Sequence, residues 1–192
     1  MRRYNRPLKN EKYMKKIIVI GCPGSGKTTF AERLCRLSGL PLFYLDAIWH
    51  KSDRTHISRA EFDERLSEIL SLGSWIIDGN YSRTVERRMA ACDTVILFDL
   101  PVEVCLAGAV ARLGTKRLDM PWIDTELDPW LEREILEFPT QHLPAIYDLM
   151  ETYKDSREII VFRSHEEADA FLARLRETPK GIKGMDVSFE EA

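Results

Sequence analysis

Short apolar runs alternate with amphipathic stretches along this chain of 192 residues. The apolar runs are brief and are bounded by turn residues, which is typical of buried strands. They cover residues 17–20, 42–45, 75–77, 94–98 and 158–162. Strand patterns that alternate with helical patterns predict an α/β domain built on a mostly parallel sheet.

The stretches between these runs carry helical spacing. Residues 58–70, for example, place Phe62, Leu66, Ile69 and Leu70 on one face of a helix. Further helices are predicted from Lys27 to just before Gly39, from Ser82 or Thr84 to Ala91, and over 101–113, 129–137, 143–153 and 165–176.

One region breaks this regular alternation. Residues 114–128 have no clean period and contain Gly114 and Pro121, so we expect a loop that serves as a lid. The two helical stretches that follow are separated near Pro139 and Pro144. The lid as a whole is placed at about residues 114–140.

The first apolar run ends in the sequence GCPGSGKT, residues 21–28, which fits the phosphate-binding pattern G-x-x-x-x-G-K-[ST]. Its glycines let backbone N–H groups wrap around phosphate oxygens, and the helix that follows adds positive potential at its N-terminus. Lys27 supplies a charge for the β- and γ-phosphates, and the Thr28 hydroxyl is placed to ligate Mg²⁺. The nucleotide-binding residues are predicted to be Gly21, Cys22, Pro23, Gly24, Ser25, Gly26, Lys27, Thr28 and Thr29.

ATP with Mg²⁺ is the expected ligand, because the chain lacks the guanine-reading pattern N-K-x-D. A second Mg²⁺ anchor should be an acidic residue at the end of a strand beside the first one. Asp78 in WIIDGNYSRT and Asp99 in VILFDLP both meet this description, and periodicity does not choose between them.

The distribution of charge and the cysteines indicate where the folded domain lies in the chain and in which compartment the protein is expected. The formal charge of −3 is uneven, since residues 1–16 hold seven Lys or Arg and one acid, Glu11. We expect residues 1–13 and 178–192 to be disordered tails, with Met14 as an alternative start, around a domain at 14–177. Four cysteines without C-x-x-C spacing, no secretory signal and no run of roughly 18 apolar residues favour a cytoplasmic protein that does not bind membranes.

Four motifs together carry a family resemblance: IIVIGCPGSGKTT, LPLFYLDAIWHKSD, WIIDGNYSRT and DTVILFDLPVEVCL. The chain resembles the adenylate-kinase-like branch of P-loop kinases, and most narrowly the bacterial proteins labelled DNA topology modulation protein, or topology modulation kinase-like ATPase. This resemblance implies a three-layer αβα P-loop NTPase fold, with a five-stranded parallel sheet in the order 2-3-1-4-5 and a small helical lid. That order places the third strand beside the first, which favours Asp78 over Asp99.

The resemblance also assigns roles to single residues. Asp46, at the end of the second strand, takes the place of an acid that accepts the proton of an acceptor hydroxyl. Trp49 and His50 follow closely and could line an acceptor pocket by stacking, and a packing role for Trp49 is an equal alternative. Arg83 takes the place of an arginine that holds phosphate. Relatives carry two arginines four positions apart before the lid, and these places fall at Gly108 and Arg112, so the first charge is missing.

Two functions follow from these residues. The first is a Mg²⁺-dependent kinase that moves the γ-phosphoryl group of ATP to a small hydroxyl, nucleoside or nucleotide acceptor, with Lys27, Asp46, Arg83 and Arg112 as its catalytic residues. The second is a nucleotide-switched regulatory ATPase that affects DNA topology or a protein partner. Direct DNA binding is disfavoured, because the chain beyond residue 16 carries 21 basic and 30 acidic residues.

Overall fold

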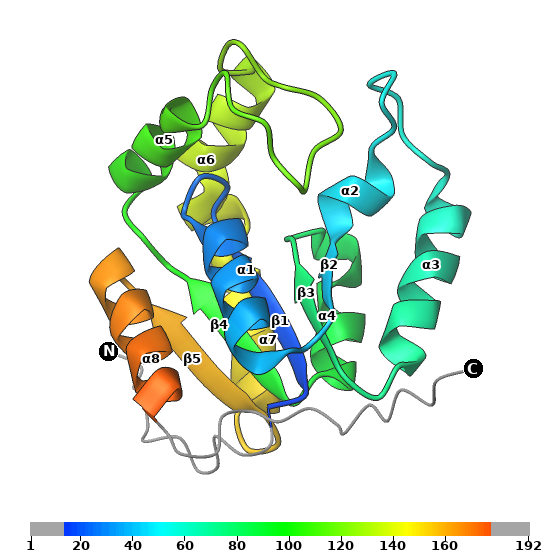
Figure 1. The fold of residues 1–192 in the computed structure, drawn as a ribbon, viewed down its shortest axis with the longest axis vertical. Coiled ribbons are helices and arrows are strands. Elements are labelled where there is room, and N and C mark those ends of the chain that lie inside the picture. Colours follow the sequence, from blue (N-terminus) through cyan, green and yellow to red (C-terminus); the bar gives the residue numbers. More distant parts are fainter. Residues whose placement is uncertain (1–13, 178–192) are drawn as a thin grey trace, which may run out of the picture.

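The computed structural model describes residues 14–177, which form a five-stranded sheet covered by helices (Figure 1). The strand order is β2-β3-β1-β4-β5, and every neighbouring pair is parallel. The strands are β1 (Lys16–Gly21), β2 (Leu42–Tyr44), β3 (Trp75–Asp78), β4 (Thr94–Phe98) and β5 (Glu158–Phe162). The predicted α/β class and strand order are therefore confirmed, and all strands end at one edge of the sheet.

Helices lie on both faces of this sheet, which gives three layers. Figure 1 shows α1 and α8 in front of the sheet and α4 and α7 behind it. The helices are α1 (Lys27–Ser38), α2 (Leu45–Trp49), α3 (Arg59–Ser71), α4 (Ser82–Ala91), α5 (Val102–Ala111), α6 (Pro129–Gln141), α7 (Leu143–Tyr153) and α8 (His165–Glu177). Within residues 14–177, none of them combines the length and apolar character that a membrane span requires.

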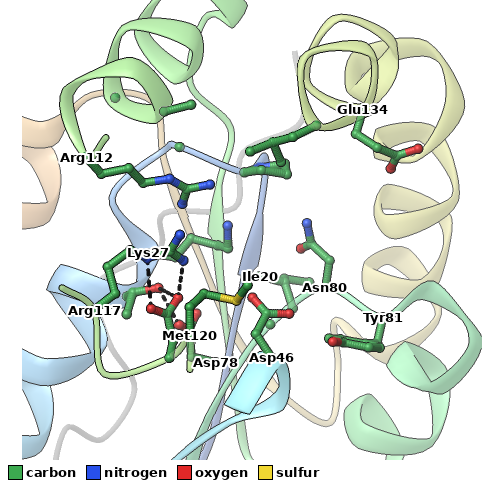
Figure 2. Close-up of a pocket in the computed structure, with 18 of the residues that line it drawn as sticks. Ile20, Lys27, Asp46, Asp78, Asn80, Tyr81, Arg112, Arg117, Met120 and Glu134 are labelled. Carbon is green, nitrogen blue, oxygen red and sulfur yellow. Dashed lines mark hydrogen bonds and ion pairs between the residues drawn. The ribbon is translucent and has the colours of Figure 1, made fainter. Parts of the chain in front are cut away.

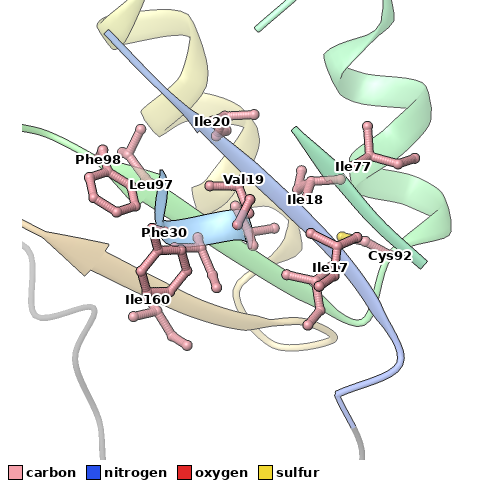
Figure 3. Packing of buried hydrophobic residues seen from close by; sticks show 14 of the residues in the cluster. Ile17, Ile18, Val19, Ile20, Phe30, Ile77, Cys92, Leu97, Phe98 and Ile160 are labelled. Carbon is pink, nitrogen blue, oxygen red and sulfur yellow. The ribbon is translucent and has the colours of Figure 1, made fainter. Parts of the chain in front are cut away.

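Aromatic packing fixes α1 on the sheet. Phe30 of α1 lies with its ring centroid 5.3 Å from the rings of both Phe98 and Phe162, and 6.2 Å from Phe171 of α8. Figure 3 shows Phe30 among the buried side chains of the sheet. Pairs of this geometry contribute about 0.5–1.5 kcal/mol each beyond the burial of their area. This packing holds the first turn of α1, and so the glycine loop, in a fixed place above β1.

Two elements differ from the sequence prediction. Leu45 begins the short helix α2 instead of ending a strand, and α6 continues through Pro139 to Gln141 instead of stopping near residue 137. Pro139 has no N–H for the carbonyl of Ile135, four residues earlier, and that carbonyl instead lies 3.9 Å from the Cys22 thiol. The burial of Ile135 and Phe138 keeps the helix continuous across the proline.

The predicted lid loop, residues 114–128, contains no helix or strand. It is tied at its base by a backbone hydrogen bond of 2.7 Å from the Gly114 amide to the Asp124 carbonyl. The two predicted tails, residues 1–13 and 178–192, lie outside the described part of the chain.

Candidate functional site

The glycine loop, residues 21–28, joins β1 to α1 at the carboxyl edge of the sheet and forms one wall of a cavity of about 1440 Å³. Gly21, Gly24 and Gly26 all have positive φ, and Gly26 is the N-cap of α1. The helix therefore begins with its unpaired N–H groups directed toward the loop, which is the arrangement that receives phosphate. Pro23, Gly24, Gly26, Lys27, Thr28 and Thr29 line the cavity.

Cys22 and Ser25 do not line the cavity. Both are buried, with the Cys22 thiol directed to the carbonyl of Ile135 in α6. Hydrogen bonding with the Cys105 thiol and burial raise the pKa of Cys22. These two loop residues can therefore offer a nucleotide only their backbone groups.

Lys27 is folded back into the loop. Its Nζ donates a hydrogen bond of 2.8 Å to the carbonyl of Cys22, and the residue is buried. Burial lowers the pKa of Lys27, and the nearby carboxylate of Asp78 opposes this effect. The ammonium is thus held at the mouth of the loop, where a terminal phosphate would lie.

The hydroxyl of Thr28 joins three segments of the chain. It donates a 2.7 Å hydrogen bond to Asp78 Oδ2 at the end of β3, and it lies 3.4 Å from Asp119 Oδ2 of the lid loop. The pairing of Val19 in β1 with Asp78 in β3 brings the third strand beside the loop. The structure thus places Asp78, and not Asp99, at Thr28.

Asp78 sits in an environment that suits a cation. It is 5% exposed, and burial raises its pKa to about 6, against the lowering influence of Lys27 and the Thr28 hydroxyl. Its Oδ1 atom is buried and has no hydrogen-bond partner among the described residues. A hydroxyl and a carboxylate with a free oxygen are ligands that Mg²⁺ prefers, so these residues fit the metal.

Asp99, the alternative anchor, faces a different neighbour. It follows β4, and its carboxylate accepts a hydrogen bond from the Tyr147 hydroxyl of α7. Its backbone amide donates to the carbonyl of Phe162. Asp99 therefore helps to join β4 to α7 and β5.

A carboxylate stands across the cavity from the glycine loop. Asp46 lies in the first turn of α2, just beyond β2, and lines the cavity together with Tyr81. Burial and the neighbouring Asp46 carboxylate raise the pKa of Tyr81. In Figure 2, Asp46 and Tyr81 lie on one side of the cavity, and Lys27, Arg112 and Arg117 lie on the other.

Aromatic side chains pack on the α2 side of the cavity, where Asp46 lies. Trp49 stacks on His56 with 4.4 Å between ring centroids and meets Phe62 edge-on at 5.5 Å. His50 meets Trp122 of the lid edge-on at 5.1 Å. Burial lowers the pKa of His50, which favours a neutral ring. Trp49 and His50 both line the cavity, as predicted from the sequence, and Trp49 is at the same time a packing residue.

The two predicted arginines behave differently. Arg112 follows α5, extends into the cavity above Lys27 in Figure 2, and has its pKa lowered by burial and by the nearby Arg117. Arg83, at the start of α4, makes a two-pronged ion pair with Asp63 of α3, with distances of 2.7 and 2.9 Å. Both partners of this pair are exposed, so the guanidinium of Arg83 is held by α3, although Arg83 also lines the cavity.

The packing around Gly108 explains why this position, before the lid, does not hold the arginine found in relatives. A Cβ atom built on Gly108 would lie 2.1 Å from the carbonyl oxygen of Gly24, and one built on Gly24 would lie 2.0 Å from the carbonyl oxygen of Cys105. The backbone of α5 therefore touches the backbone of the glycine loop. An arginine at position 108 would not fit.

Sequence reasoning did not single out Asn80 and Arg88, which hold the turn beside the cavity. The side chain of Asn80 accepts a 2.9 Å hydrogen bond from the Gly21 amide and donates one of 2.6 Å to the Gly21 carbonyl, so it ties the wall to the loop. Arg88, with no exposed surface, donates to the carbonyls of Gly79, Asn80 and Tyr81. Nothing in the sequence marks an arginine of an amphipathic helix as buried. Asp-Gly-Asn at residues 78–80, in contrast, is a recognisable turn sequence.

Comparison with known proteins agrees with this arrangement at the level of the fold. No protein-family model matches the chain, and no curated protein sequence matches it. A shikimate kinase from Acinetobacter baumannii, solved with shikimate, matches 91% of this chain and 100% of its own, with 17% identity and a TM-score of 0.54. The shikimate kinase of Bacteroides thetaiotaomicron matches 85% and 97%, with 17% identity and a TM-score of 0.50.

The fold is that of a P-loop kinase. The shared fold agrees with the broader resemblance to P-loop kinases read from the sequence. The narrower resemblance to the topology modulation proteins finds no support in these comparisons.

Proposed function

We propose that this protein is an ATP-dependent kinase that transfers the γ-phosphoryl group to a hydroxyl of a small acceptor. One observation carries the proposal: a single cavity contains the glycine loop with Lys27, the Thr28–Asp78 pair, and the carboxylate of Asp46 on the opposite side. A kinase that uses this fold needs these three parts within one enclosure. The P-loop kinase fold of the chain supports the same conclusion.

Each nucleotide contact has a candidate residue. The N–H groups of the glycine loop and of the first turn of α1 would hold the phosphates. Lys27 would exchange its bond with the Cys22 carbonyl for a phosphate oxygen. Arg112, which already reaches into the cavity, would stabilise charge on the transferring group. Thr28 and Asp78 would hold Mg²⁺, which neutralises charge on the phosphate oxygens when it is bound.

The acceptor is activated from the α2 side. The acceptor oxygen would form a bond to the γ-phosphorus while the bond from that phosphorus to the β–γ bridging oxygen breaks and leaves ADP. The hydroxyl proton would pass to the carboxylate of Asp46, which orients the attacking oxygen. The aromatic rings of Trp49 and Tyr81 give this side an apolar wall against which a sugar, nucleoside or other alcohol could pack.

The test is an acceptor screen. ADP release from ATP and Mg²⁺ is measured with a panel of sugars, nucleosides, nucleotides and carboxylated alcohols, using wild type, Lys27→Ala and Asp46→Asn. With a productive acceptor, we expect Lys27→Ala to lower the rate at least about 100-fold and Asp46→Asn to lower it about 10²–10⁴-fold.

Matched controls use exposed residues of the same types. Lys51→Ala and Asp148→Asn each remove a similar charge from the surface, and neither residue lines the cavity. Both should retain the wild-type rate. ATP binding with slow ADP release that no acceptor accelerates, or an accelerated rate that survives Asp46→Asn, would contradict the kinase proposal.

A further inference from the structure

A buried carboxylate from the lid loop reaches the glycine loop. Asp119 lies in the segment 114–128, which has no regular secondary structure, yet it is only 2% exposed. Its Oδ2 atom lies 3.4 Å from the hydroxyl oxygen of Thr28. An acidic side chain is rarely buried without a specific partner, so this position needs an explanation.

Arg117 holds Asp119 in this position. Its Nε donates a 2.9 Å hydrogen bond to Asp119 Oδ1, and its Nη2 donates to Oδ2 of the same carboxylate. Arg117 also pairs with Asp124 at 3.8 Å. The lid loop therefore carries its own two-pronged support for one carboxylate, and Figure 2 shows Arg117 on the same side of the cavity as Lys27.

Three oxygen-bearing groups from three segments meet at this point. They are the Thr28 hydroxyl of α1, the Asp78 carboxylate of β3 and the Asp119 carboxylate of the lid. The single hydroxyl hydrogen serves Asp78 at 2.7 Å, which leaves the longer approach to Asp119 without a hydrogen to share. In addition, Asp78 Oδ1 is buried without a partner.

The cluster contains two carboxylates and one hydroxyl, and one of its carboxylate oxygens, Asp78 Oδ1, receives no hydrogen bond from the described residues. A buried carboxylate oxygen without a donor is costly, and a divalent cation would satisfy it. Mg²⁺ is usually held by one or two carboxylates together with phosphate oxygens and water, which matches two carboxylates and one hydroxyl.

We propose that Asp119 is a direct ligand of the divalent cation, so that the lid loop completes a metal site begun by Thr28 and Asp78. This inference rests on the proposed function and deepens it. Because Asp119 belongs to the lid, occupation of the metal site and the position of the lid are coupled. Arg117, which is hydrogen-bonded to the same carboxylate, is thereby held on the side of the cavity that contains Lys27.

The experiment measures metal binding directly, with Mn²⁺ as the probe and a non-hydrolysable ATP analogue present. Electron paramagnetic resonance gives the affinity for Mn²⁺, and pulsed measurements in labelled water count the water molecules on the ion. In Asp119→Asn we expect at least about tenfold weaker Mn²⁺ binding and one additional bound water. Asp119→Glu, which keeps a carboxylate, should recover part of the affinity.

Asp124→Asn is the matched control. It lies in the same loop and pairs with the same Arg117, but its carboxylate accepts from Trp122 Nε1 instead of facing Thr28. It should bind Mn²⁺ within about threefold of wild type. Equal unfolding temperatures for both variants would exclude a general loss of stability.

The outcomes separate the two proposals. If wild type binds neither the nucleotide analogue nor Mn²⁺, the proposed function fails. If wild type binds both and Asp119→Asn binds Mn²⁺ equally well, direct ligation by Asp119 is wrong. Weaker binding with an unchanged water count also overturns direct ligation, because it assigns Asp119 to the sphere outside the bound ligands.

Discussion

Gly108→Ala tests whether close backbone packing positions the glycine loop. The added Cβ would lie 2.1 Å from the Gly24 carbonyl oxygen, whereas real Cβ atoms essentially never come within 3.0 Å of another heavy atom. The α5 backbone and the loop would therefore have to separate by at least 0.9 Å, the difference between these two distances. Both contacting atoms belong to rigid backbone, so no flexible side chain can move away.

Two opposite effects determine how far Gly108→Ala changes the free energy of unfolding. Alanine is favoured over glycine inside a helix by about 0.8–1.0 kcal/mol. Overpacking a tight contact typically costs about 1–3 kcal/mol. We expect the overpacking to dominate, with a net loss of about 1 kcal/mol in the free energy of unfolding. Nucleotide binding should suffer more, about tenfold or greater, because a binding site tolerates displacements of only about 0.5 Å.

Urea unfolding gives the stability, and calorimetric titration with an ATP analogue and Mg²⁺ gives the affinity. Ala107→Gly, at an exposed position of the same helix, measures the helix-propensity effect alone. Gly73→Ala adds a methyl group where nothing lies within 4 Å and should be neutral or slightly stabilising. If Gly108→Ala is at least as stable as wild type and binds the analogue equally well, the contact does not position the loop and the reasoning is refuted.

Three further predictions concern single side chains. Because burial raises the pKa of Asp78 to about 6, ionisation of this carboxyl should remove up to about 3 kcal/mol of stability from the metal-free protein, relative to Asp78→Asn, as the pH rises from about 4 to about 6. Urea unfolding across that range should show this difference in slope between wild type and Asp78→Asn, and an equal slope in both would contradict the assignment. Arg88→Met should cost about 3 kcal/mol or more in thermal unfolding, because it leaves the carbonyls that Arg88 serves without donors, and a loss below about 1 kcal/mol would contradict that role. Arg112→Ala should lower kcat/KM for an identified acceptor about 100-fold, whereas Arg83→Ala, whose guanidinium is held by Asp63, should lower it less than about fivefold, and the reverse ranking would restore the sequence-based role of Arg83.

Residues that follow strands could be placed at one edge of the sheet, because the family resemblance supplied the strand order on which their place depends. β3 lies beside β1 and brings Asp78 to the loop that follows β1, but β4 also flanks β1 and is followed by Asp99, so only the side-chain contact of Asp78 with Thr28 decides between the two acids. The positions of Asp46 and Asp78 at this edge could therefore be anticipated, although the choice of Asp78 over Asp99 depends on that contact. The glycine loop could be anticipated as well, since its motif specifies its own backbone.

Residues of the lid were not predictable in this way. A segment without periodicity gives no information about which side chains turn inward, so nothing in the sequence distinguishes Asp119 from the other acids of residues 119–137. Its place depends on the pairing with Arg117, which is a tertiary contact. Pro139 misled the prediction for a related reason, since burial of Ile135 and Phe138 overrides its local tendency to end a helix.

Arg88 has a mechanical consequence for how ligands enter the cavity. Its guanidinium clamps the turn at residues 79–81 to α4, while Asn80 ties the same turn to Gly21. Because this turn is hydrogen-bonded both to a helix and to the central strand, it cannot move independently of them. This side of the cavity is therefore rigid. Opening and closing must then come from the lid loop, whose Arg117 lies on the other side of the cavity in Figure 2. Motion measured in the free protein should concentrate there and leave the turn at 79–81 rigid.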